Sequence, residues 1–393
     1  MLNYNLKPGQ IDDTLIQEEY EGVIAFNPFP GLRPFSIEES HLFFGREDQV
    51  DEILIKLSKH RFISILGQSG SGKSSLINCG LVPVLYGGFM TDSGPHWQII
   101  QSRPGQSPYD NLTQSIVKFL IKEGRISQEE SGTHKLIINS ILKSGSHGLI
   151  ELCKYLRAQH HENIFFLFDQ FEEIFRLREN APEHSDEVTS FVNLIITSLK
   201  NRSLPIYIAI AMRSDFIGEC ASFPGLTNLI NLSNYLIPQM TRDQKRIAIE
   251  GPIAVGGGKI SQRLVKRLLT DIGDSQDQLP ILQHSLMRTW DYWVENHELG
   301  EPLDIRHYNA IGKIHQALSL HANEAYEELN QREKEIAEIL FKTITEKNQQ
   351  NQWLRRAERL RTIAQIADCS EQDLINVIER FRQSGRSFLM PSA

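Results

Sequence analysis

The 393-residue sequence has little cysteine and no long apolar run. Its four cysteines are too scattered for a disulfide framework or a zinc site: Cys79, Cys153, Cys220 and Cys369. No apolar stretch approaches the ~20 residues of a membrane-spanning helix. The N-terminus also lacks the basic and apolar segments of a secretory signal. These absences predict a protein of the reduced cytoplasm, with no membrane partner.

Positive charge is also scarce, since 41 Lys and Arg face 49 Asp and Glu, for a net charge of -8. Because nucleic-acid phosphates are neutralised by basic surface, this balance weighs against a protein that mainly coats nucleic acid. Some arginines do gather near the end of the chain: Arg355, Arg356, Arg359, Arg361, Arg380, Arg382 and Arg386. A solvated face explains them better than DNA contact does.

Several catalytic patterns are missing as well. The 13 histidines show no H-E-x-x-H or similar metal-binding spacing. The sequence contains no G-x-S-x-G nucleophile elbow. It also lacks an Asn-Lys-x-Asp quartet, the guanine-reading element expected of a GTPase. These absences weigh against a zinc protease, a serine hydrolase of the α/β type and a GTPase.

What is present is a series of short apolar runs that predict buried strands. They are Phe62–Leu66, Trp97–Gln101, Ile164–Phe168, Ile206–Met212 and Tyr235–Ile237. Segments with helical spacing lie between several of them, such as 112–122 and 188–199. Strands that alternate with helices predict a parallel α/β sheet covered on both faces.

The pattern divides the chain into four parts. We expect residues 1–26 to form a tail and residues 27–240 to form the α/β domain. After Met240 the strand signal almost disappears, so residues 241–329 predict a helical domain and residues 330–393 a smaller helical unit.

The last unit has a helix-turn-helix pattern. Thr362–Asp368 and Asp373–Arg382 predict two short helices, with Ser370 as the N-cap of the second and Asp373 as its capping-box carboxylate. The apolar run Arg386–Met390 predicts a closing strand. Together these features predict a winged-helix-like domain.

One glycine-rich segment fits the phosphate-binding pattern G-x-x-x-x-G-K-[ST]. It reads Gly67, Gln68, Ser69, Gly70, Ser71, Gly72, Lys73 and Ser74, and Ser75 opens the helix that follows. The backbone N–H groups and the helix dipole would hold the phosphates, Lys73 would reach the β- and γ-phosphates, and Ser74 would ligate Mg²⁺. Because the segment lies between a strand and a helix, it predicts an α/β P-loop NTPase with a parallel sheet.

A carboxylate follows the apolar run Ile164–Phe168. Asp169 at the end of a buried strand is expected to orient the Mg²⁺ shell together with Ser74. Two further carboxylates, Glu172 and Glu173, follow within one turn, and either of them could position the attacking water. They could equally form the acidic first turn of a helix.

Arg213 follows the run Ile206–Met212, at the edge where open α/β sheets bind ligands. We expect it to contact the γ-phosphate and thereby to sense the nucleotide state. The alternative is a simple ion pair with Asp215.

Four segments in this order resemble the STAND ATPases, which include the AP-ATPase and NACHT groups. They are Phe44-Gly45-Arg46-Glu47, Asp169-Gln170-Phe171-Glu172-Glu173, Met212-Arg213-Ser214-Asp215-Phe216 and Leu279-Pro280-Ile281-Leu282-Gln283. The sequence is most similar to the first of the novel STAND families of bacterial signalling proteins. The resemblance covers roughly residues 27–390.

The resemblance implies ATP and ADP as ligands. Phe44, Gly45 and Arg46 would lie against the adenine, and Pro280 would pack on the bound nucleotide. Gln278 stands where the family has a glycine. The winged helix would fold back on ADP as a lid.

The resemblance also implies a switch that rests with ADP, forms homo-oligomers with ATP and hydrolyses ATP slowly. The output would be bacterial signalling or antiviral defence. Family members carry sensor and effector modules and a histidine-containing stretch after the winged helix, and none of these is present here. We therefore expect a fragment, or modules supplied by other chains. Two alternatives are a nucleotide-gated DNA-binding regulator and a scaffold that binds ATP without hydrolysis.

Overall fold

The computed structural model describes residues 26–158, 162–180, 182–273, 279–347, 353–355, 358–383 and 385–389. The expected tail up to residue 25, Gln278 and Met390 lie outside these residues. Within the described ranges, no helix combines the length and the apolar character needed to cross a membrane.

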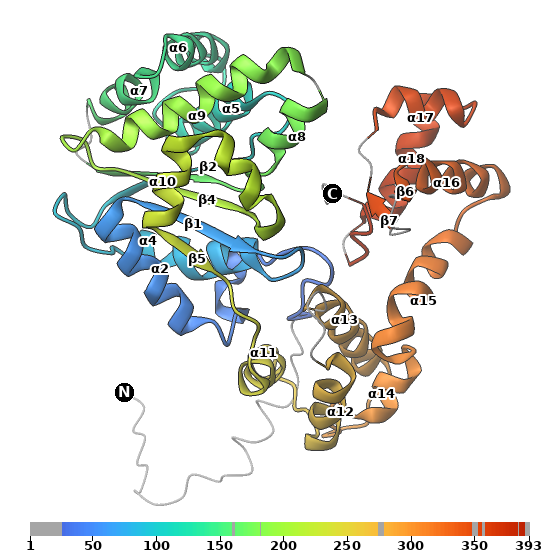
Figure 1. Cartoon of the computed structure of the whole chain (residues 1–393). Coiled ribbons are helices and arrows are strands. Elements are labelled where there is room, and N and C mark those ends of the chain that lie inside the picture. Colours follow the sequence, from blue (N-terminus) through green and yellow to red (C-terminus); the bar gives the residue numbers. More distant parts are fainter. Residues whose placement is uncertain are drawn as a thin grey trace, which may run out of the picture.

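A parallel five-stranded sheet forms the centre of the first half of the chain (Figure 1). Its strands are β1 (Phe62–Gly67), β2 (Trp97–Ser102), β3 (Asn163–Phe168), β4 (Ile206–Arg213) and β5 (Asn234–Leu236). All five expected strands and the parallel arrangement are confirmed. The order is β2-β3-β4-β1-β5, so β4 lies between the P-loop strand and the strand that precedes Asp169.

The two faces of the sheet carry alternate residues of each strand, as the period of two requires. Phe166 and Ile208 point to one face, and Phe165 and Ala209 to the other. The helices that pack on the first face are α5 (Pro108–Lys122), α6 (Ser131–Lys143), α7 (Gly148–Arg157), α8 (Glu173–Asn180), α9 (Ser185–Lys200) and α10 (Pro224–Leu232). The second face is covered by α2 (Glu47–His60) and α4 (Val82–Tyr86). Shorter helical segments are η1 (Ile37–Leu42), α3 (Lys73–Ser75), η2 (Leu76–Leu81), η3 (Pro182–His184) and η4 (Ser214–Ser222).

A second core lies among helices that follow the sheet (Figure 1). They are α11 (Arg242–Val255), α12 (Gln262–Ile272), α13 (Leu279–Asn296), α14 (Ile305–Ala310) and α15 (Lys313–Glu327). Phe29, from the segment expected to open the α/β domain, is buried in this core instead. The Asn27 side-chain amide also donates to the Met287 carbonyl at 2.9 Å and to Asp291 Oδ1 at 2.7 Å. The segment Asn27–Phe35, called the lead-in below, therefore crosses from the helical core to the sheet domain.

The last unit contains α16 (Gln331–Thr343), α17 (Leu360–Ile366) and α18 (Glu371–Arg382), and the end of α15 packs on it. The expected helix pair is present, and Ser370 Oγ accepts a hydrogen bond from the Asp373 N–H at 3.1 Å. The Asp373 carboxylate does not cap in return. It accepts from the Ser370 hydroxyl at 2.7 Å.

The expected closing strand at Arg386–Met390 is wrong for its described residues. Gly385 and Ser387 have φ of 84° and 47°, which breaks an extended strand. Phe388 packs into the core instead, and its N–H donates to the Phe381 carbonyl at 2.9 Å. A small antiparallel hairpin does occur, but before the helix pair, as β6 (Thr345–Lys347) and β7 (Trp353–Arg355). The assignment of this unit as a winged helix stays a prediction.

Candidate nucleotide-binding site

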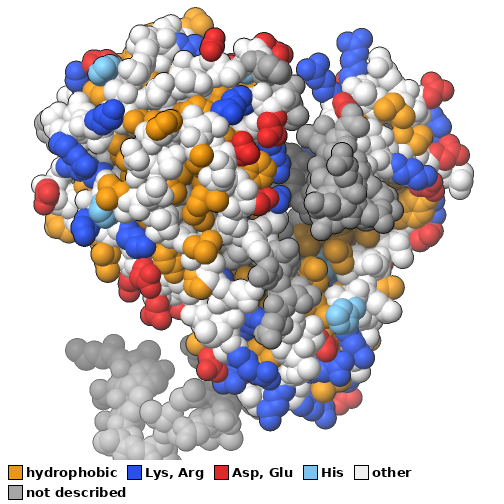
Figure 2. Space-filling model, viewed as in Figure 1, with side chains coloured by type: hydrophobic (Ala, Val, Ile, Leu, Met, Phe, Trp, Pro, Cys, Tyr) orange, Lys and Arg blue, Asp and Glu red, His pale blue; other side chains and the backbone are white. Residues whose placement is uncertain are grey.

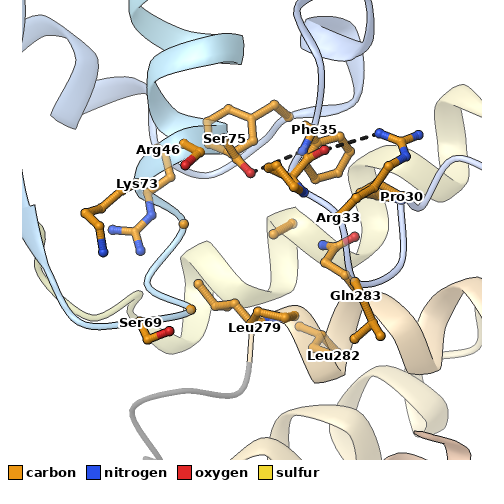
Figure 3. Close-up of a pocket in the computed structure, with 18 of the residues that line it drawn as sticks. Pro30, Arg33, Phe35, Arg46, Ser69, Lys73, Ser75, Leu279, Leu282 and Gln283 are labelled. Carbon is orange, nitrogen blue, oxygen red and sulfur yellow. Dashed lines mark hydrogen bonds between the residues drawn. The ribbon is translucent and has the colours of Figure 1, made fainter. Parts of the chain in front are cut away.

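A cavity of about 290 Å³ lies at the carboxyl end of the sheet, between the sheet domain and the helical core. Its walls include the P-loop, the lead-in residues Pro30–Phe35, the segment before α2, the strand ends at Arg103, Asp169 and Arg213, α11 and the start of α13. Figure 3 shows Lys73 and Ser69 from the P-loop facing Leu279 and Gln283 from α13 across this space. The site therefore depends on both domains.

The P-loop has the backbone that its glycines predict. Gly72 lies at φ 87°, in the left-handed region, immediately before α3 begins at Lys73. At Gly67 an added Cβ would lie 2.6 Å from Ser71 Oγ, so any larger residue there would displace the Ser71 side chain. Ser69 and Gly70 line the cavity. The start of the helix therefore directs its backbone N–H groups and the positive end of its dipole towards the cavity.

Lys73 is folded back on its own loop. Its Nζ donates to the carbonyls of Gly67 at 2.8 Å and Gln68 at 2.7 Å. Burial lowers the pKa of Lys73, and the nearby carboxylates of Glu172 and Asp169 act in the opposite direction. To meet a phosphate, Lys73 has to exchange these carbonyls for phosphate oxygens.

Ser74 and Asp169 lie together, as expected. The Ser74 hydroxyl donates to Asp169 Oδ2 at 3.1 Å. The Asp169 N–H donates to the Ser102 carbonyl at 3.0 Å, and Oδ1 accepts from the Gln170 N–H at 3.0 Å. Gln170 takes a φ of 55°, which turns the chain sharply after β3. This turn sets the carboxylate beside the P-loop hydroxyl.

The two glutamates that follow point to different places. Glu172 is buried and lines the cavity, where its Oε2 accepts from the Arg213 N–H at 3.3 Å. Glu173 Oε2 accepts from the Gly105 N–H at 2.8 Å, in the loop after β2. Burial raises the pKa of Glu173. The Glu172 side chain thus points to the cavity, whereas the Glu173 side chain points to the loop after β2. Glu173 is also the first residue of α8.

Arg213 lines the cavity and pairs with Gly67 in the register of β4 and β1. Its guanidinium contacts the Asp215 carboxylate twice, Nε at 3.0 Å and Nη2 at 2.7 Å. The ion pair left open by the sequence is therefore present, at a residue that lines the cavity.

The segment Phe44–Arg46 packs between α2 and α11. Phe44 lines the cavity, and a Cβ added at Gly251 of α11 would lie 2.7 Å from its ring. Gly45 has φ 85° and would meet the Gln244 carbonyl at 2.7 Å if it carried a Cβ.

Arg46 also lines the cavity, and its guanidinium donates to the Gln49 side chain at 3.2 Å and to two backbone carbonyls. It donates to the Pro238 carbonyl at 2.8 Å and to the Ser71 carbonyl at 3.3 Å. Burial lowers the pKa of Arg46 to about 10. Arg46 therefore ties the P-loop to the segment that leads from β5 to α11.

Helix α13 meets the P-loop at its first turn. Leu279 and Pro280 line the cavity, and the Leu279 side chain lies 3.9 Å from the Cβ position of Gly72. Pro280 stands in the first turn, where a proline costs no hydrogen bond, so its ordinary role as a helix-start residue also holds.

Sequence reasoning missed three contributors. Arg103, which follows β2, lies 3.4 Å from Asp169, and Gln283 extends the α13 wall. In the lead-in, the Phe35 N–H donates to Ser75 Oγ at 3.3 Å, as Figure 3 shows. One signal was available, because Arg103 follows an apolar run just as Arg213 does. Gln283 ends the family segment that begins at Leu279, in which only Pro280 is expected to contact the nucleotide, and nothing local marks Phe35.

The chain also matches several solved structures, each at low identity and with a TM-score below 0.5. The Walker-type ATPase PABY2304 of Pyrococcus abyssi is 12% identical, with a TM-score of 0.46, over 90% of this chain and 92% of that one. The ORC1 protein of Aeropyrum pernix in complex with DNA is 11% identical, with a TM-score of 0.48, over 86% and 83%. Cdc6p of Pyrobaculum aerophilum is 13% identical, with a TM-score of 0.41, over 86% of each chain.

No curated protein matches the sequence. A family model does match, and it is described as Novel STAND NTPase 1. The match extends over residues 28–391, which includes the lead-in, the P-loop, the Asp169 segment and α13. The resemblance noted from the four sequence segments is thus confirmed, and the chain belongs to the Novel STAND NTPase 1 family.

Proposed function

We propose that this chain is an ATP-binding, slowly hydrolysing switch that rests with ADP and forms homo-oligomers with ATP. The observation that carries the proposal is that one cavity is walled by the P-loop on one side and by α13 and the lead-in on the other. A ligand in such a cavity contacts both domains. It can therefore bias their arrangement by as much as it prefers one arrangement over the other.

The residues present fit a Mg²⁺ ion at the phosphate end. The Ser74 hydroxyl and the Asp169 carboxylate, 3.1 Å apart, are two hard oxygen ligands beside the P-loop. The described residues contain no group of three or more His, Cys, Asp or Glu side chains that could hold a metal. That agrees with an ion that is completed by phosphate oxygens and water. When bound, it would neutralise charge that develops on the phosphates.

Each charged side chain of the cavity would then have a separate role in hydrolysis. Lys73 would leave the Gly67 and Gln68 carbonyls and contact the β- and γ-phosphates. Glu172, which lines the cavity, would orient a water and accept its proton. Arg213 would exchange Asp215 for the γ-phosphate. The base and ribose would lie against the remaining lining residues, which are Phe44, Met240, Leu282 and the lead-in. With adenine as the base, the nucleotide would be ATP.

The first experiment is calorimetry of the Lys73→Ala variant with ATP and Mg²⁺. Losing a charged donor on the phosphates costs roughly 1.5–3 kcal/mol, so affinity should fall at least about tenfold. Lys266→Ala, on an exposed position of α12, is the matched control. Unchanged affinity in Lys73→Ala, with an unchanged circular dichroism spectrum, would remove the P-loop from the site.

The oligomer and the signalling output need their own test. We expect the ADP complex to scatter as a monomer and a complex with a non-hydrolysable ATP analogue to form a larger species. If both nucleotides give one size at all concentrations, the chain does not oligomerise by itself. Sensor and effector modules supplied by other chains would then be required.

The structure gives less support to the alternative function, a DNA-binding regulator. The C-terminal helix α18 presents Glu371 and Asp373 in its first turn, and Arg382 pairs with Glu379. Figure 2 shows Lys and Arg gathered most densely at the lower end, where Figure 1 places α12 and α14. There Arg263 and Arg306 are paired with Asp304 and Glu301. A gel shift beside a phosphate-release assay separates the two functions.

A further inference from the structure

Arg103 sits at the carboxyl end of the edge strand β2, next to Asp169. Its Nη2 lies 3.4 Å from Asp169 Oδ2, on the same carboxylate oxygen that accepts from the Ser74 hydroxyl. The guanidinium therefore supplies positive charge at the place proposed for the cation. A guanidinium and a metal ion compete for the same carboxylate, because each needs its negative charge.

The side chain of Arg103 has room to move. It is 47% exposed. It also lines both the nucleotide cavity and a second, polar cavity of about 370 Å³ on the other side of Asp169. Ser74 and Asp169 border both cavities as well. A small rotation of Arg103 is therefore enough to change the partner of its guanidinium.

The backbone that carries Arg103 is held firmly. The Asn111 side-chain amide donates to the Arg103 carbonyl at 3.2 Å and to the Pro104 carbonyl at 2.8 Å. Glu173 accepts from the Gly105 N–H at 2.8 Å. Gly105 has φ 57°, and an added Cβ there would lie 2.6 Å from Asn111 Nδ2. Glu173, the carboxylate that points away from the cavity, thus holds the loop of Arg103.

We propose that Arg103 is a nucleotide-state sensor that neutralises Asp169 in the absence of Mg²⁺ and contacts the γ-phosphate when Mg²⁺ and ATP are bound. With Asp169 neutralised by the ion, the strongest negative charge near Arg103 is the γ-phosphate, and the planar guanidinium suits phosphate oxygens. ADP has no such group. Glu173 is a positioning residue that acts through the loop. This inference rests on the proposed ATP-binding function.

Arg213 is a second arginine at the same edge of the sheet, but its starting position differs. Its guanidinium is held by Asp215 at 2.7 Å and 3.0 Å, whereas Arg103 lies on the metal-site carboxylate itself. Only the loss of Arg103 should therefore alter the affinity for Mg²⁺. This difference separates the two residues in experiments.

The test uses the full chain with Arg103→Ala, and calorimetry with ATP, ADP and Mg²⁺. We expect affinity for ATP with Mg²⁺ to fall about tenfold and that for ADP without Mg²⁺ to stay unchanged. The Mg²⁺ concentration that half-saturates the ADP complex should fall severalfold, because the competing cation is gone. A residue that only supports the fold would weaken all three affinities together. An unchanged ratio of ATP to ADP affinity overturns the sensor, and an unchanged Mg²⁺ midpoint overturns its competition for Asp169.

Variants of Glu173 provide a second experiment. Glu173→Gln keeps an acceptor oxygen for Gly105 and should keep the parent ratio of ATP to ADP affinity, whereas Glu173→Ala should lower it. Glu179→Ala, exposed on the same helix, is the control. If Glu173→Ala keeps the parent ratio, Glu173 has no positioning role. A parent chain that binds no nucleotide would refute the proposed function instead, so the two failures are distinguishable.

Discussion

The Nε2 atom of His284 lies 2.9 Å from the Nδ1 atom of His321, and both rings are buried. His284 follows Gln283 of the cavity wall on α13, and His321 belongs to α15. The ring of Phe388, from the last unit, packs against both at centroid distances of 6.3 Å and 5.2 Å. The histidine pair therefore joins the helix at the nucleotide site to the C-terminal unit.

Acid is expected to weaken this junction. Burial lowers the pKa of His284 to about 4 and that of His321 to about 3, from an ordinary value of 6.5. Because an exposed histidine binds its proton at higher pH than these buried rings, the stabilisation is complete above about pH 6.5 and is lost as the pH falls towards the folded pKa values. Thermal unfolding should show a midpoint that drops between pH 7 and pH 5.

The charges around the pair act in the same direction. Arg288 and Arg386 both oppose protonation of His321, and each is paired with a glutamate, Glu324 and Glu328 respectively. A variant with both histidines changed to leucine should lose most of the pH dependence over this range. Parallel midpoint curves for this variant and the parent chain would contradict the role of the pair.

Glu172 and Glu173 should differ in hydrolysis. Glu172→Gln removes the carboxylate that lines the cavity, so turnover should fall about a hundredfold while ATP stays bound. Glu173→Gln keeps the bond to Gly105 and should change turnover little. Single-turnover phosphate release measures both. Equal losses of turnover in the two variants would show that the direction of the side chain does not determine which glutamate is the general base.

Gln283 is expected to select the base of the nucleotide. Its Oε1 is buried and has no hydrogen-bond partner among the described residues, and Figure 3 shows the amide near the lead-in, across the cavity from Lys73. An amide can accept from the amino group of adenine while it donates to a ring nitrogen. Inosine presents a carbonyl at the position of that amino group.

Gln283→Ala should therefore reduce the preference for ATP over inosine triphosphate about tenfold. Competition binding with the two nucleotides measures this preference. Gln262→Ala, exposed at the start of α12, serves as the control. The same preference in Gln283→Ala and the parent chain would assign base selection to other residues.

Asn27 should stabilise the junction between lead-in and helical core. Asn27→Ala removes three hydrogen bonds, to the Met287 carbonyl, to Asp291 and from the Phe29 N–H, and leaves the Asp291 carboxylate, whose pKa burial already raises, without its amide donor. The cost should be about 1–3 kcal/mol in chemical denaturation. Asn296→Ala, exposed at the end of α13, should cost much less. Equal stability of the Asn27 variant and the parent would show that the lead-in is not held by this residue.

The strands, the P-loop and Asp169 could be predicted from the sequence because their signals are local. A buried strand such as Ile164–Phe168 is a short apolar run, and a phosphate loop needs glycines at fixed spacing. The helix pair around Ser370 is likewise encoded by capping and periodicity within a few residues. The family segments added the involvement of α13.

Other features depend on contacts between distant residues, so only the tertiary structure decided them. The position of β4 between β1 and β3 brings Arg213 level with Gly67, and the turn at Gln170 sends Glu172 into the cavity and Glu173 away from it. The apolar run at Arg386–Met390 predicts a strand by its local pattern, yet the backbone at Ser387 turns Phe388 into the core. The pairing of Arg103 with Asp169 joins two strand ends that are 66 residues apart. Local periodicity determines which residues are buried, whereas the direction and partner of a side chain are set by packing across the whole fold.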